Sequence, residues 1–159
     1  IPEVVEAVPE ISLYTDEYTL TLRYSLAGLL EKTLSKRAYL KSGAYLVIEP
    51  TEAMTVIDVN SGKSIKGRNA EEQFLKINIE AAREIARQLR LRNISGIVMI
   101  DFINMKEEEH NRELMKVLAE SVRTDPVRTT VVDMTKLGLV ELTRQKGKRA
   151  LHEVFSEIK

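Results

Sequence analysis

Two apolar runs that each end in an aspartate constrain this sequence more than any other feature. The first aspartate, Asp58, follows the run MTVI at 54–57, and the second, Asp101, follows IVMI at 97–100. Runs of this composition and length are typical of strands, and a carboxylate at the end of a buried strand is costly unless it is paired or bound. An amphipathic stretch between the runs can return the chain to the same sheet edge as a crossover helix. The pattern therefore predicts one shared acidic site at the carboxyl edge of an α/β sheet.

A divalent cation would satisfy such a site. Two aspartate oxygens, completed by waters and a substrate phosphate, suit Mg²⁺, for which Mn²⁺ can substitute. Asn60 lies one pleat beyond Asp58 and so on the same strand face, where it can orient a metal ligand or contact a phosphate. Spacing alone leaves a second interpretation open, in which Asp58 caps a loop and Asp101 pairs with a surface arginine.

Two clusters of basic residues accompany the acidic pair. Because 24 basic and 24 acidic residues give a net charge of zero, any attraction for nucleic acid has to come from local clusters. With no Trp in the chain, base-specific recognition by stacking is not expected here. The residues predicted to contact RNA are Lys63, Lys66, Arg68, Arg144 and Lys146.

Helical and strand patterns alternate along the chain. Helices are expected over Glu17–Leu34, after Asn69, after Glu107 and over Lys136–Arg144; strands are expected over Tyr45–Glu49, Met54–Val59, Ile97–Phe102 and Thr129–Val132. The first two strands are close enough to form a hairpin, and the third is the most apolar and therefore central. This order predicts an α/β fold with a mixed sheet and flanking helices.

Length and composition bound the remaining possibilities. One domain is expected over residues 13–147, after an extended arm or linker remnant at 1–12 and before a basic tail or helix end at 148–159. The absence of Cys excludes disulfides and thiolate metal sites. No apolar run is long enough to span a membrane, so a cytoplasmic protein is expected. The first residue is Ile, which suggests a piece of a longer protein.

The same residues resemble the catalytic subdomain of the ribonuclease E/G family, bacterial endoribonucleases of RNA processing and decay. The resemblance covers roughly residues 13 to 147 and is carried by TEAMTVIDVNS at 51–61, NIEAA at 78–82, EIARQLRLR at 84–92, GIVMIDFINM at 96–105 and LGLVELTRQ at 137–145. It implies a DNase I-like mixed-sheet sandwich in which Asp58 and Asp101 bind catalytic Mg²⁺. Asn60 matches a supporting asparagine, and Arg144 an RNA-phosphate contact.

The resemblance also implies an activity. The family cleaves single-stranded RNA with a metal-activated water, leaving 5′-phosphate and 3′-hydroxyl ends, and its members form homo-oligomers. This chain lacks the S1 module, the ribonuclease H-like subdomain, the 5′-end sensing pocket and the cysteines of the family's zinc link, and Asn104 stands where relatives often have Asp. We therefore expect weak or no activity from the chain alone. The alternatives are a non-catalytic RNA-binding or dimerisation module and, third, a nuclease that acts on DNA.

Overall fold

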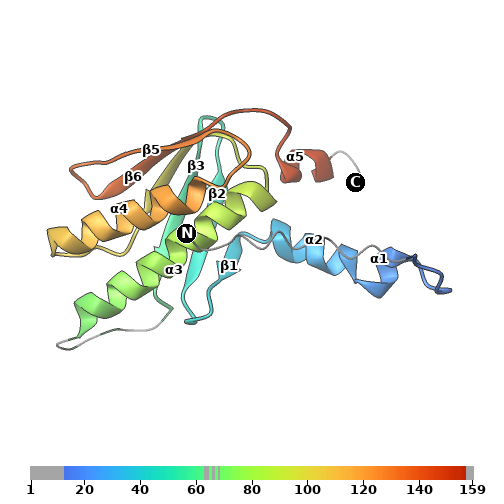
Figure 1. Ribbon diagram of the computed structural model, residues 1–159, viewed down its shortest axis with the longest axis horizontal. Helices are drawn as coiled ribbons and strands as arrows, with labels where there is room; N and C mark the ends of the chain where they lie inside the picture. Colours follow the sequence, from blue (N-terminus) through green and yellow to red (C-terminus); the bar gives the residue numbers. More distant parts are fainter. Residues whose placement is uncertain (1–12, 63–64, 66, 68, 157–159) are drawn as a thin grey trace, which may run out of the picture.

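The computed structural model describes residues 13–62, 65, 67 and 69–156 (Figure 1). The arm predicted at residues 1–12 lies outside this part of the chain. The strands are β1 (Arg37–Tyr39), β2 (Tyr45–Pro50), β3 (Met54–Asn60), β4 (Gly96–Asp101), β5 (Thr129–Met134) and β6 (Leu139–Arg144). The helices are α1 (Leu20–Arg23), α2 (Leu26–Leu34), α3 (Ala70–Leu91), α4 (Glu108–Val122) and α5 (Leu151–Ser156).

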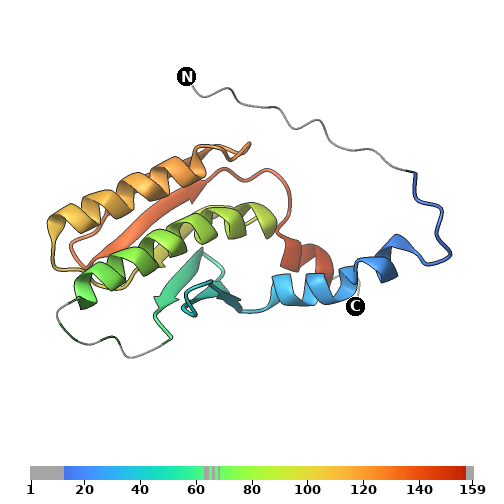
Figure 2. The ribbon, with the colours of Figure 1, turned by 60° about the horizontal axis from the view of Figure 1, so that its bottom comes forward.

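The strands form one mixed sheet in the order β1-β2-β3-β4-β6-β5. Only β3 and β4 pair in parallel, and α3 is the crossover that connects them. The hairpin pairing of β2 with β3 is antiparallel, as predicted, and β4 lies inside the sheet between β3 and β6. Figure 2 shows α3 and α4 side by side along the sheet. The predicted α/β class, with a mixed sheet and flanking helices, is confirmed.

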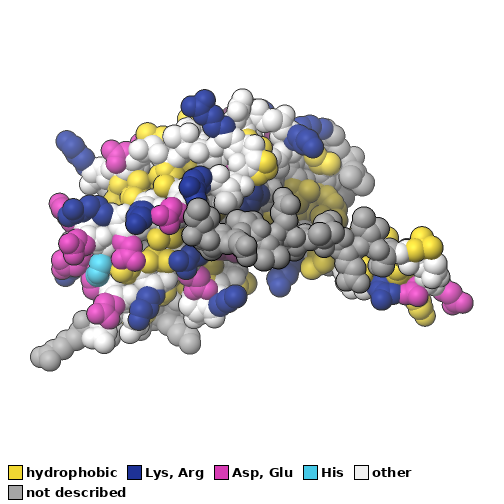
Figure 3. Space-filling view, viewed as in Figure 1, with side chains coloured by type: hydrophobic (Ala, Val, Ile, Leu, Met, Phe, Trp, Pro, Cys, Tyr) yellow, Lys and Arg dark blue, Asp and Glu magenta, His cyan; other side chains and the backbone are white. Residues whose placement is uncertain are grey.

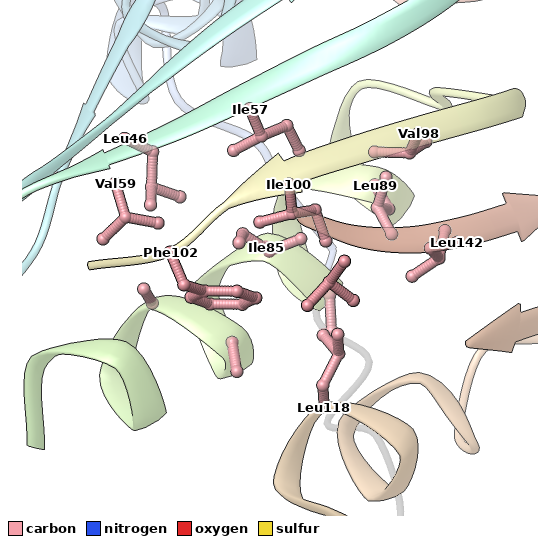
Figure 4. Close-up of a cluster of buried hydrophobic side chains, with 14 of the residues drawn as sticks. Leu46, Ile57, Val59, Ile85, Leu89, Val98, Ile100, Phe102, Leu118 and Leu142 are labelled. Carbon is pink, nitrogen blue, oxygen red and sulfur yellow. The ribbon is translucent and has the colours of Figure 1, made fainter. Parts of the chain in front are cut away.

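The hydrophobic core lies between the sheet and these two helices. Strand alternation buries Ile57 and Val59 of β3, and α3 contributes Ile85 and Leu89. Figure 4 shows these side chains pointing toward one another, with Leu118 of α4 closing the cluster. Each fully buried Leu or Ile contributes about 1.5–3 kcal/mol relative to an exposed one, so this layer of side chains fixes the register of the strands.

The opposite face of the sheet stays open. Along β3, the residues between the buried ones are exposed, and Val56 is 36% exposed. On β4, Ile97 is 47% exposed, while its neighbour Val98 is fully buried. Residues with the parity of Val56 and Ile97 therefore face away from the core, and Asp58 and Asp101 are among them.

The helix predicted over Glu17–Leu34 is wrong in its continuity and its packing. Ser25, which separates α1 from α2, has a φ of 48°, which breaks the helical path. Leu22 is 68% exposed and Leu29 is 53% exposed, and neither helix contains a buried residue. Figure 1 shows that both helices project beyond the sheet, so most of the apolar stripe is exposed, and Leu30 and Leu34 near the end of α2 are half-buried.

The helix predicted over Lys136–Arg144 is also wrong, because these residues form a turn and strand β6. Burial alternates there with period two: Val140, Leu142 and Arg144 are buried while Thr143 is exposed. Strand β1 is not among the predicted elements, and its residues lie between the predicted helix and the strand predicted from Tyr45. None of the helices in the described residues is long and apolar enough to cross a membrane.

Candidate active site

The two aspartates that end the apolar runs lie side by side. Because β3 and β4 are parallel, their carboxyl ends meet at one edge, and Asp58 is the direct register partner of Asp101. Neighbouring strands are about 4.8 Å apart, and both side chains are exposed on the open face. The strand pairing thus brings two carboxylates from distant parts of the sequence within reach of one cation.

Asn60 supports the first of these carboxylates. Its Nδ2 donates a hydrogen bond of 2.7 Å to Oδ2 of Asp58, which restricts the rotation of the carboxylate. Among the described residues, neither Asp58 nor Asp101 forms a salt bridge with Arg or Lys. The interpretation in which Asp101 pairs with a surface arginine is therefore not what this part of the structure shows.

The donor set decides which metal these residues could hold. Within the described ranges, no group of three or more His, Cys, Asp or Glu side chains could enclose a metal ion. Two carboxylates alone do not make a closed structural site. They do fit Mg²⁺, which keeps several waters and is commonly held by one or two carboxylates together with substrate phosphates.

An aromatic and basic patch, not expected from the sequence, lies beside the acidic pair. Strand β1 places Arg37 opposite Val47, which is opposite Asp58; Tyr39 is opposite Tyr45. The Tyr39 and Tyr45 rings have centroids 5.9 Å apart, and the Arg37 guanidinium lies 5.1 Å from the Tyr45 centroid.

Tyr45 is in turn opposite Asn60, so this patch continues the same open face from the acidic pair to the β1 edge. The sequence signal for this patch is the turn KSG at 41–43, which lies between two short runs, RAYL and AYLVIE. In the structure Gly43 has a φ of 88° and closes the hairpin between these runs. We refer to Arg37, Tyr39 and Tyr45 as the β1–β2 patch.

The predicted RNA-contacting cations do not all lie near the acidic pair. Lys63, Lys66 and Arg68 lie outside the described residues, in the stretch between β3 and α3. Lys146 follows β6, and because β6 is antiparallel to β4, Arg144 is opposite Gly96 at the start of β4. Strand β4 separates that end from Asp101 by about 17 Å. Figure 3 shows acidic and basic side chains mixed over the face it draws, so no field of one sign covers it.

Arg144 differs most from its expected surface role, because its side chain is buried and only 3% exposed. Nε and Nη2 donate to the two oxygens of Asp125 at 2.8 and 3.2 Å, and Nη1 donates to Oδ1 of Asn93 and the carbonyl oxygen of Ile94, both at 3.0 Å. All three guanidinium nitrogens are thus bound to protein acceptors.

The partner carboxylate is equally committed. Burial raises the pKa of Asp125, but hydrogen bonds from Arg144 and from the Val127 amide, together with the arginine charge, outweigh burial and lower the pKa overall. Arg144 therefore anchors the end of β6 to the loop before β5, a structural role that sequence reasoning did not identify.

The family model and the similar proteins point to the same family. The family model described as "Ribonuclease E/G family" matches residues 2–147. The chain is 41% identical over 156 residues to ribonuclease G of Haemophilus influenzae, covering 96% of this chain and 32% of that protein. It is 39% identical to ribonuclease G of Escherichia coli K12, covering 94% and 32%, and 40% identical to ribonuclease E of a Nostoc species, covering 92% and 21%. The chain thus spans less than a third of the length of these curated relatives.

Proposed function

The chain belongs to the ribonuclease E/G family, and on that premise we propose that it carries the catalytic centre of a metal-dependent endoribonuclease of RNA processing. The observation that carries this proposal is the register pairing of Asp58 with Asp101, supported by Asn60. Two exposed carboxylates at the ends of adjacent parallel strands suit a cation-assisted reaction on a phosphodiester better than any other chemistry in the described residues.

In this proposal Asp58 and Asp101 hold Mg²⁺, and Mn²⁺ can substitute. When bound, the cation lowers the pKa of a coordinated water and offsets the charge that develops on the phosphate. Asn60 keeps the Asp58 carboxylate in a fixed orientation through its 2.7 Å hydrogen bond, so little reorganisation is needed when substrate binds. Attack of water on phosphorus with departure of the 3′ oxygen leaves a 5′-phosphate and a 3′-hydroxyl.

The β1–β2 patch favours single-stranded RNA as the substrate. Tyr39 is 68% exposed, and an aromatic ring that stacks on an unpaired base contributes about 1–3 kcal/mol per base. Bases within a duplex are already stacked and cannot use such a platform. In this proposal Arg37, an exposed residue of the same strand, contacts a phosphate near the scissile bond.

The test is substitution of each carboxylate by its amide. We expect Asp58→Asn and Asp101→Asn each to reduce Mg²⁺-dependent cleavage of a single-stranded RNA by at least about 100-fold in the full-length protein. Both side chains are exposed, so circular dichroism and the unfolding midpoint should not change. Asp133→Asn, at an exposed aspartate of β5, is the matched control and should cleave normally. Unchanged cleavage by either test variant would remove the assignment.

A non-catalytic RNA-binding or dimerisation module is the second candidate for the chain by itself. It is favoured by the exposed apolar residues of α1 and α2, which could cover a second subunit or another segment of a longer homo-oligomeric protein. Titration with Mn²⁺, followed by calorimetry, separates the two: the catalytic proposal requires binding at millimolar metal that Asp58→Asn abolishes. Cleavage of matched RNA and DNA oligonucleotides tests the third candidate, a nuclease that acts on DNA.

A further inference from the structure

A cavity of about 420 Å³ lies at the end of the sheet opposite the acidic pair. Its walls come from the end of α2, from β2, from the start of β3, from the residues after α3 and from α5; Figure 2 shows α2 and α5 at this same end of the molecule. Leu34, Ile48 and Ile94 give it an apolar lining, and Thr55 and Arg92 are among its polar residues. Its volume is in the range of small-ligand sites.

Two buried polar side chains in this cavity have donors that are not used. The described residues contain five buried polar or charged side chains: Thr55, Asn78, Gln88, Arg92 and Arg144. Asn78 is bonded to Ile103, Gln88 to Glu84 and Arg92, and Arg144 as set out above.

The two remaining side chains behave differently. The Thr55 hydroxyl and both terminal amino groups of Arg92 form no hydrogen bond within the described residues, although these residues are only 6% and 8% exposed. The side-chain atoms that are buried without a hydrogen-bond partner in the described residues are Arg90 Nη1 and His110 Nδ1, so the unused donors of Thr55 and Arg92 are not sealed from solvent. Both residues line one cavity, where a ligand that enters can reach these donors.

The Arg92 guanidinium is held in place from one side only. Its Nε donates to Oε1 of Gln88 at 2.7 Å, and Nε2 of Gln88 donates to Glu84 at 2.7 Å. Burial lowers the pKa of Arg92, which the charge of Glu84 partly offsets. This relay orients the planar group while leaving its terminal amino groups free for a ligand, and such a fork matches the oxygens of a phosphate.

The other charges around the cavity do not cancel this positive charge. Glu49, which also lines it, is paired with Lys36. His152 of α5 also lines the cavity.

We infer that this cavity is a second phosphate site, which binds the phosphate of a nucleotide at Arg92 and Thr55 and its apolar body against Leu34, Ile48 and Ile94. Thr55 precedes Asp58 by three residues on β3, which is about 10 Å along the strand, and the two side chains are on opposite faces of the sheet. The inference goes beyond the proposed function and would stand if the acidic pair did not cleave RNA.

The experiment measures binding by the 159-residue chain of inorganic phosphate, adenosine monophosphate and a short single-stranded RNA, using amide chemical shifts and calorimetry. We expect saturable binding of phosphate and tighter binding of the nucleotide. Arg92→Met should weaken both by about tenfold or more, because a hydrogen-bonded charged contact is lost. Thr55→Val, which keeps the shape of the side chain, should weaken both less. Arg83→Met, at an exposed arginine of α3, is the matched control and should bind normally.

The outcomes separate this site from the catalytic proposal. Asp58→Asn should leave phosphate binding unchanged, because Asp58 lies nearer the other end of β3 than Thr55 and on the opposite face of the sheet. If Arg92→Met fails to fold, Thr55→Val and Arg92→Lys carry the test, and unaltered phosphate affinity in both would overturn the assignment. Absence of saturable phosphate binding, or tighter binding of succinate than of phosphate, would also overturn it. If Arg92→Met weakens the binding of RNA and of adenosine monophosphate by the same factor, the site recognises a single nucleotide.

Discussion

Replacing Arg144 by Met tests whether this arginine stabilises the fold or contacts RNA. The substitution preserves much of the apolar stem but removes both hydrogen bonds to Asp125, at 2.8 and 3.2 Å, and those to Asn93 and Ile94. Asp125 then keeps only the Val127 amide and the Thr129 hydroxyl. With its side chain 1% exposed, water cannot replace the lost donors.

The expected loss of stability is large for this reason. Removing one partner of a buried, hydrogen-bonded ion pair costs about 3–5 kcal/mol, because the other charge stays buried without compensation. Against a total stability of about 5–15 kcal/mol for a domain, this is a substantial fraction. With a urea dependence of about 2 kcal/mol per molar, the unfolding midpoint should fall by about 2 M.

Urea unfolding followed by circular dichroism measures the effect, and RNA affinity is measured in parallel. Arg112→Met is the control: Arg112 and Glu108 are paired at 3.4 Å but 73% and 89% exposed, so it should cost less than about 0.5 kcal/mol. Combining Arg144→Met with Asp125→Leu should recover much of the loss, because no unpaired charge remains. A loss below about 1 kcal/mol for Arg144→Met, together with weaker RNA binding, would refute the structural role.

Three further predictions follow from the same structure. Because the pKa of Asp125 is lowered in the folded state, its contribution to stability is complete above its ordinary value of 3.8 and is lost as the pH falls through the folded pKa; urea midpoints on the acid side should show this loss in the wild type. Gly62→Ala should cost about 1–3 kcal/mol and slow cleavage, because Gly62 has a φ of 70° and an added Cβ would lie 2.5 Å from a backbone oxygen; Gly147→Ala, where the space is open, should match the wild type in unfolding and cleavage. Tyr39→Leu and Tyr45→Leu should each weaken RNA binding by about 1–3 kcal/mol in a fluorescence titration while leaving Mn²⁺ binding unchanged. Wild-type RNA affinity in both variants would show that the β1–β2 patch does not bind RNA.

The acidic pair could be predicted because its signal is local. Asp58 and Asp101 each end an apolar run, and an amphipathic helix between two runs implies a parallel crossover. Alternation along β3 then determines that Asp58 and Asn60 share the face opposite Ile57. These inferences need only strand periodicity and a crossover helix between two parallel strands, and the structure has both.

The missed elements depend on partners that are remote in the sequence. In LVELTR, which forms β6, an arginine occupies a position that alternation makes buried, and burial is tolerated only because Asp125, 19 positions earlier, reaches it. No local pattern indicates that partner, so the run by itself predicts an amphipathic helix. Similarly, the apolar stripe of residues 17–34 predicts a packed helix but does not reveal that the sheet ends before it.

The parallel pairing of β3 with β4 also determines the effect of deleting one residue from β3. Successive side chains on a strand point to opposite faces, so deletion of one residue between Met54 and Ile57 would turn Asp58 toward Ile100 and the helices. The Asp58 carboxylate would then be buried in the apolar core, and the side chain of Ile57 would be exposed. A register shift of one residue within this strand should therefore destabilise the fold, so selection for stable folding also preserves the pairing of Asp58 with Asp101.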